Sequence, residues 1–217
     1  TGEDTLSLHD ALPILGFIAL LPLFYLFERF TLTTRRVFGL WVVFTLILNL
    51  IGYHWIMHTI AVYGMMPTFV AFPLFLLYSL GTGGKMLLFF FFLRWMYRRA
   101  DIFTSAAKCT LAAAAAFGLC ELVGWQLFPW HGANIVSGDI LFAQGADLIG
   151  TRGMSVVWVA MQFLLYQAGG DFQRDKQKSF IKLATQSRNA QVFLLIAVAT
   201  HLYGYIQYSR FESFEAA

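Results

Sequence analysis

Long intervals without charged residues divide the chain into apolar segments. The longest runs from Val37 to Gly84 and contains no Asp, Glu, Lys or Arg. A helix that crosses about 30 Å of hydrocarbon needs about 20 mostly apolar residues, so this interval has room for two helices, with a break near Gly64–Pro67. The pattern predicts an all-α fold, a polytopic transmembrane helix bundle of about six membrane segments. These cover about 12–27, 37–61, 68–93, 106–127, 152–168 and 191–208, the first and fifth being short.

Composition supports this interpretation and excludes several classes of protein. Of the 217 residues only 12% are charged and 59% are hydrophobic, whereas soluble domains carry about 25% charged residues. The net charge of +3 is small and dispersed, which excludes a nucleic-acid partner. Cys109 and Cys120 stand in apolar surroundings without metal-binding or redox spacing. We therefore expect a membrane protein with no cofactor.

Basic residues fall on alternate connections between the segments. Twelve of them follow the first, third and fifth segments: Arg29, Arg35, Arg36, Arg94, Arg98, Arg99, Lys108, Arg174, Lys176, Lys178, Lys182 and Arg188. The other connections hold only Arg152 and Arg210. Because Lys and Arg accumulate in cytoplasmic loops, we expect loops 30–36, 94–108 and 169–190 inside. The C-terminus then faces outward, into the periplasm of a bacterium.

The first residues, 1–14, do not fit the membrane pattern. They are polar, lack the basic start of a signal peptide and run abruptly into Leu15. We expect them to be a non-native or disordered tail. Residues 15–210 form the predicted transmembrane domain.

One carboxylate, Glu121, lies inside a predicted span, and intramembrane carboxylates are functional candidates. At about 1.5 Å per residue it is about 22 Å from Ala106, toward the outer surface, and Trp55 is about 27 Å from Val37 on its own helix. The aromatic Phe128–Trp130 run follows Glu121 directly. The residues expected to share an outward, lipid-facing level are Trp55, His58, Glu121, Phe128, Pro129 and Trp130.

Two other features have structural explanations. His54 and His58 are four residues apart and could hold a metal or haem, but beside Tyr53 and Tyr63 they also fit an aromatic belt at the membrane surface. We favour the belt and expect no metal site. Lys85, about 26 Å from the outer end of the third segment, is expected to extend toward the inner surface, at a depth opposite to that of Glu121.

Several stretches together resemble the membrane helices of apolipoprotein N-acyltransferase. The run from Trp55 to Pro67 (WIMHTIAVYGMMP), followed by FPLFLLYSL from Phe72, resembles its third and fourth helices. The run ELVGWQLFPW from Glu121, continuing through QGADLIG to Ser155, resembles its Glu…Phe-Pro-Trp…Gln-Ala…Gly signature. YGYIQYSR from Tyr203 resembles its seventh helix. Gly124 stands where the family usually has an Arg.

The resemblance implies a function. The family transfers a fatty acyl group from a phospholipid, through a cysteine thioester, to the N-terminal diacylglyceryl-cysteine of an apolipoprotein in the bacterial inner membrane. Its Glu/Lys/Cys triad lies in a nitrilase-like domain that would begin where residues 211–217 stand, so no catalytic residue maps onto this chain. We expect the chain alone to be inactive. The alternatives are a stand-alone polytopic binding or transport protein and a metal- or haem-binding membrane anchor.

Overall fold

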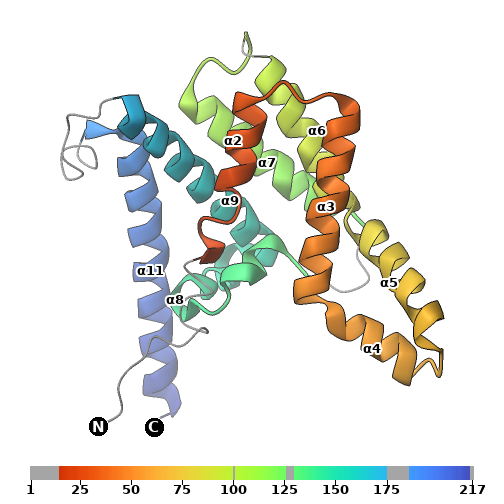
Figure 1. The fold of residues 1–217 in the computed structure, drawn as a ribbon. Helices are drawn as coiled ribbons and strands as arrows, with labels where there is room; N and C mark the ends of the chain where they lie inside the picture. Colours follow the sequence, from red (N-terminus) through yellow and green to blue (C-terminus); the bar gives the residue numbers. More distant parts are fainter. Residues whose placement is uncertain (1–14, 100, 126–129, 175–185, 216–217) are drawn as a thin grey trace, which may run out of the picture.

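The computed structural model describes residues 15–99, 101–125, 130–174 and 186–215. Within these ranges the chain is helical and contains no strand. Figure 1 shows the helices as one bundle, with α11 along one flank and the α4–α5 pair along another. In chain order the elements are α2 (Leu21–Arg29), α3 (Thr34–Gly52), α4 (His54–Val62), α5 (Thr68–Thr82), α6 (Gly84–Arg98), α7 (Ala106–Val123), η1 (Gly132–Val136), α8 (Ile140–Ala143), α9 (Ala146–Arg174) and α11 (Arg188–Glu215).

The all-α membrane bundle expected from the sequence is confirmed. In the described residues four helices (α3, α7, α9 and α11) are long and apolar enough to cross a membrane. The pair α5–α6, bent by 44°, makes a fifth span if counted as one. Large apolar side chains such as Leu77, Leu111, Val123 and Leu195 are exposed on these helices, as expected of surfaces that face lipid.

Three predicted segments differ from the helices observed. The described part of the first holds only the nine-residue α2, which is too short to span a bilayer. The second is divided at Tyr53, whose backbone (φ −127°, ψ 19°) leaves the helical region, so that α4 turns away from α3. The fifth is longer than expected, because α9 runs from Ala146 to Arg174. It has a kink at Gly150 (φ 71°), a positive φ that glycine adopts without strain.

The core is built from aromatic side chains of helices that are distant in sequence. α7 packs along α9 and α6, where Phe117 contacts Phe89 and Trp158 edge-on, with ring centroids 5.1 and 5.9 Å apart. Such edge-to-face pairs add about 0.5–1.5 kcal/mol beyond the area that they bury. Phe24 of α2 packs on Phe163 of α9 at 4.8 Å, so even the short α2 is fixed to the bundle.

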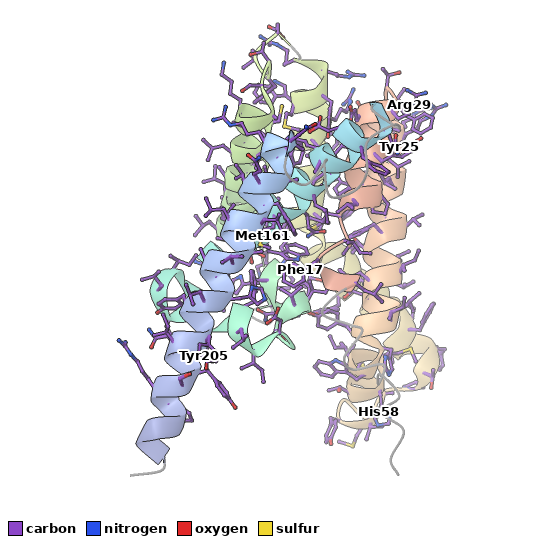
Figure 2. The ribbon with its side chains drawn as sticks, turned by 90° about the vertical axis from the view of Figure 1, so that its left-hand side faces the viewer. Phe17, Tyr25, Arg29, His58, Met161 and Tyr205 are labelled. Carbon is purple, nitrogen blue, oxygen red and sulfur yellow. The ribbon has the colours of Figure 1, made fainter. Side chains whose placement is uncertain are left out.

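The basic connections lie at one end of the bundle. Arg94 donates a hydrogen bond to the Thr34 hydroxyl at 3.0 Å, and Arg98 donates to the Leu32 carbonyl at 3.4 Å. These bonds join the end of α6 to the start of α3. Figure 2 shows Arg29 at this end and His58 and Tyr205 at the other. In the described residues, the connection before α3 and the connection after α6 therefore lie at the same end of the bundle.

The last helix, α11, is held mainly by α9 and α8. His201 on α11 lies with Nε2 2.9 Å from a carboxylate oxygen of Asp139, the N-cap residue of α8. Three residues further along, the backbone of Leu141 approaches Gly204 so closely that a Cβ there would lie 2.0 Å from the Leu141 carbonyl oxygen. A glycine at this position is what allows α8 and α11 to touch.

The arrangement predicts opposite accessibility for two exposed positions, Thr104 at the basic end and Ser137 after η1. In a background in which Cys109 and Cys120 are Ala, a membrane-impermeant thiol reagent added to whole cells should label Ser137→Cys and leave Thr104→Cys unlabelled. Permeabilised cells should show both labelled. Labelling of Thr104→Cys alone in intact cells would invert the orientation expected from the basic loops.

Candidate functional site

A bend between α5 and α6 directs Lys85 into the bundle. α5 ends at Thr82, Gly83 lies between the helices, and the Trp41 indole of α3 donates a hydrogen bond to the Gly83 carbonyl at 2.7 Å. Thr45 packs against the same glycine, where a Cβ would lie 2.4 Å from its methyl carbon. α3 thus packs against the bend. Lys85 follows Gly83 by two residues and is only 8% exposed.

Lys85 meets Glu121 of α7 at this point. The Lys85 Nζ lies 4.0 Å from Glu121 Oε1, so the expectation of opposite depths was wrong. That expectation placed Lys85 by counting residues from the outer end of segment 68–93, as if the segment were one straight helix. The segment is in fact bent by 44° between α5 and α6. Counted from the basic end at about 1.5 Å per residue, Lys85 is about 20 Å from Arg98 and Glu121 about 22 Å from Ala106. The two charges therefore share one level.

Glu121 is 1% exposed, and both of its oxygens have partners. Oε1 accepts a hydrogen bond from the backbone N–H of Gly132 at 2.6 Å, and Oε2 lies 3.2 Å from His131 Nδ1. The donor and acceptor roles in the contact with His131 depend on the tautomer of the imidazole. We call Lys85, Glu121, His131 and Gly132 the buried polar cluster. Its several donors offset the cost of placing a carboxylate in an apolar interior.

The buried polar cluster fixes the chain segment 130–136. Lys85 Nζ donates to the Trp130 carbonyl at 2.7 Å and lies 5.3 Å from the centre of the Trp130 ring, a cation–π distance. The Ala133 N–H donates to the Ser155 hydroxyl of α9 at 3.0 Å. Gly132 lies so close to Phe117 that a Cβ would be 2.8 Å from the ring. The segment is thereby attached to α6, α7 and α9.

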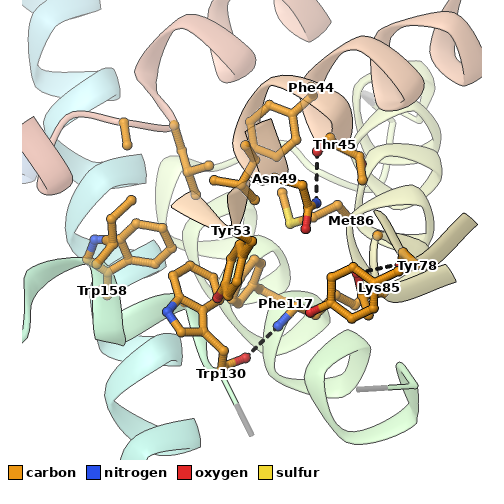
Figure 3. A pocket seen from close by; sticks show the side chains of 17 residues that line it. Phe44, Thr45, Asn49, Tyr53, Tyr78, Lys85, Met86, Phe117, Trp130 and Trp158 are labelled. Carbon is orange, nitrogen blue, oxygen red and sulfur yellow. Dashed lines mark hydrogen bonds between the residues drawn. The ribbon is translucent and has the colours of Figure 1, made fainter. Parts of the chain in front are cut away.

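Beside the buried polar cluster lies a cavity of about 170 Å³. Figure 3 shows Lys85, Trp130 and Tyr53 around one part of it, with Phe44 and Thr45 of α3 at another. The Tyr53 and Trp130 rings meet edge-on, 6.1 Å apart. The break after α3 thus contributes an aromatic wall. Most of the remaining wall is apolar and comes from Leu20, Leu48, Met86, Phe117, Ile135 and Trp158.

The structure brings some of the expected site residues together and separates others. Glu121 and Trp130 meet through Lys85, which contacts both. Trp55 and His58 lie on α4, exposed, and do not line the cavity. Phe128 and Pro129 lie outside the described residues. Sequence reasoning missed His131 and the pairing of Lys85. The signal was present, because two opposite charges within spans usually pair with one another.

The metal alternative rests on His54 and His58 of α4. No group of three His, Cys, Asp or Glu side chains there is arranged to hold a metal ion. The Nδ1 of His54 lies 3.3 Å from the carbonyl of Ile51 in its own helix turn, and both His54 and His58 are exposed.

Comparison with known proteins bears on the segment that carries this site. Residues 6–164 match the family model of the apolipoprotein N-acyltransferase N-terminal domain. The chain belongs to this family. All members of the buried polar cluster lie within the match, and so do α2 to α8 and most of α9. The resemblance noted in the sequence is thereby confirmed.

Relatives of the family are found in Leptospira interrogans. Apolipoprotein N-acyltransferase 2 of serovar copenhageni is 31% identical over 144 residues, which are 62% of this chain and 23% of the relative. Apolipoprotein N-acyltransferase 1 of serovar Lai is 31% identical over 155 residues, 69% of this chain and 26% of the relative. The chain thus spans about a quarter of these acyltransferases. No solved structure shows a significant match.

The buried pair predicts a specific coupling in stability. Lys85→Met should destabilise the membrane domain by about 3–5 kcal/mol, because it leaves Glu121 charged in an apolar interior. Adding Glu121→Gln to Lys85→Met should restore part of the loss, since the uncompensated charge is removed. Thermal unfolding in detergent, followed by tryptophan fluorescence, measures both.

Lys108→Met is the matched control, because Lys108 is exposed at the start of α7. Its effect should stay below about 0.5 kcal/mol. Strict additivity of Lys85→Met and Glu121→Gln would show that the two side chains do not interact.

Proposed function

We propose that this chain forms the membrane part of an apolipoprotein N-acyltransferase and presents a phospholipid acyl donor to a catalytic domain beyond its C-terminal end. The observation that carries the proposal is the attachment of the 130–136 segment to a buried ion pair inside a domain of this family. A loop fixed at one level of the membrane is suited to positioning a lipid, because reacting groups must be held in a defined geometry.

In this proposal the residues expected to face lipid have two different roles. Trp130, half-buried at the cavity, and Trp55 and His58, exposed on α4, meet lipid or its headgroup region. The proposal gives the same role to Phe128 and Pro129. Glu121 is buried and acts as a positioning residue. It holds Gly132, and with Lys85 it fixes the place of Trp130.

The chemistry would proceed in two transfers in the bacterial inner membrane. A cysteine thiolate of the catalytic domain attacks an ester carbonyl of the phospholipid, which forms a thioester and releases a lysophospholipid. The free α-amino group of the diacylglyceryl-cysteine on an apolipoprotein then attacks the thioester, forming an amide and returning the thiol. α11 runs away from the basic end of the bundle (Figure 1), which would lead the chain to the periplasmic face where lipoprotein precursors are modified.

Neither cysteine of this chain suits the nucleophile. Cys109 is half-buried, and its thiol donates to the carbonyl of Phe103 at 3.6 Å. Cys120 is also half-buried and packs against the hydrophobic core. Their role in this proposal is structural, and the chain alone is inactive.

The test joins residues 15–164, which lie within the family match, to the part of a Leptospira relative that lies beyond the matched region. With phospholipid carrying a labelled acyl chain, the fusion should form a labelled thioester and pass the label to a diacylglyceryl-cysteine peptide. Glu121→Gln should slow single-turnover thioester formation by about tenfold or more, because a misplacement of about 1 Å can cost about 100-fold in rate.

Lys108→Gln serves as the control and should leave the rate unchanged, since Lys108 is exposed far from the cluster. The chain without the added domain should acquire no label. A labelled adduct on Cys109 or Cys120 would contradict the proposal, as would a well-folded Glu121→Gln fusion that reacts at the full rate.

A further inference from the structure

The cavity beside the buried polar cluster has two chemically different parts. Lys85, Tyr53 and Trp130 stand at one part, at the level of Glu121. Phe44 stands nine residues before Tyr53 on α3, about 13 Å closer to the basic end, and Figure 3 shows it across the cavity from Trp130. The cavity therefore extends from an amphipathic end into a mostly apolar end, where Thr45 is the polar residue beside Phe44, along the direction in which α3 crosses the membrane.

The positive charge of Lys85 in the cavity wall is paired with the carboxylate of Glu121. Among the described residues that line the cavity, Lys85 is the one with a charged side chain. Glu121 lies 4.0 Å from its ammonium group, and the Trp130 carbonyl accepts one of its hydrogen bonds. An anionic phosphate would have to compete with a carboxylate already in place. The wall therefore favours an apolar ligand over a lipid headgroup.

We propose that this cavity binds the terminal part of one phospholipid acyl chain, with the headgroup remaining outside. This inference rests on the proposed function and adds a chain-binding site within the membrane helices. Its volume of about 170 Å³ slightly exceeds the cavity of about 150 Å³ that is known to bind benzene in an apolar protein core. It accepts the end of a chain and excludes a whole lipid.

Two side chains define how far the chain end can enter. Phe44 closes the apolar part from α3, where its ring also packs on Phe90 at 5.5 Å. Leu48, one helical turn later on the same face, lies between Phe44 and the polar end. A larger side chain at Leu48 would occupy the space that the acyl chain needs, while the buried polar cluster stays intact.

The experiment uses the 217-residue chain in nanodiscs of phosphatidylethanolamine and phosphatidylglycerol. Two photoreactive phosphatidylethanolamines are compared, one with a diazirine at the end of an acyl chain and one with a diazirine on the headgroup. After illumination, mass spectrometry locates the labelled residues. The tail-end probe should label the lining residues of α3 and α6, which are Phe44, Thr45, Leu48, Asn49 and Met86. The headgroup probe should not.

Leu48→Phe should lower labelling inside the cavity by about tenfold, because overfilling a packed site is unfavourable. Leu50→Phe is the matched control on the same helix: Leu50 is 49% exposed and does not line the cavity, so labelling should stay unchanged. Phe44→Ala provides a second variant that should extend tail-end labelling toward the basic end. Thermal unfolding verifies that each variant is folded.

The outcomes separate this inference from the proposed function. Labelling restricted to exposed lipid-facing residues, equal labelling by both probes, or unchanged labelling in folded Leu48→Phe would overturn the chain-binding site. A fusion protein that still transfers acyl groups would leave the proposed function standing in that case. Conversely, cavity labelling in the chain together with a fusion that never forms a thioester would retain the site and reject the proposed reaction.

Discussion

The contact between Lys85 and Glu121 organises the centre of this membrane domain. Each charge alone would be costly between apolar helices, and their 4.0 Å separation leaves room for further donors and acceptors. The structure supplies these from the backbone: the Gly132 N–H binds the carboxylate, and the Trp130 carbonyl accepts from the ammonium group. The ion pair therefore also binds segment 130–136, which lies outside α6 and α7.

The pair exists because two long apolar segments are interrupted. The bend at Gly83 stands two residues before Lys85, at the place where α5 ends and α6 begins, and Lys85 of α6 meets Glu121 of α7 there. The exposed carbonyl that such a bend creates is satisfied by the Trp41 indole, as backbone groups in a membrane interior require. The interruption at Tyr53 contributes the ring that packs on Trp130. The two interruptions, at Gly83 and at Tyr53, thus lie next to the buried polar cluster and the cavity.

The sequence predicted what depends on composition and on long intervals without charge. It predicted the helical membrane bundle and the family, and it named Glu121 and Trp130, which the structure links through Lys85. It did not give the depth of Lys85, because helix-rise counting assumes straight helices and no local motif at Gly83 announces a 44° bend. His131 was missed for a related reason. Its contact with Glu121 depends on how residues 130–132 fold back, which spacing along a helix cannot show.

The position of α11 has a consequence for the order in which the protein is made. The fully buried members of the hydrophobic core run from Leu20 to Phe163, and α11 adds only half-buried side chains such as Phe193 and Ile196. A ribosome releases the chain from its N-terminal end, so every fully buried core residue is available before α11 emerges. The contacts of α11 through Gly204 and His201 join it to a part of the chain that is synthesised earlier. The contact between Asp139 and His201 therefore belongs to the attachment of the last helix and not to the buried core.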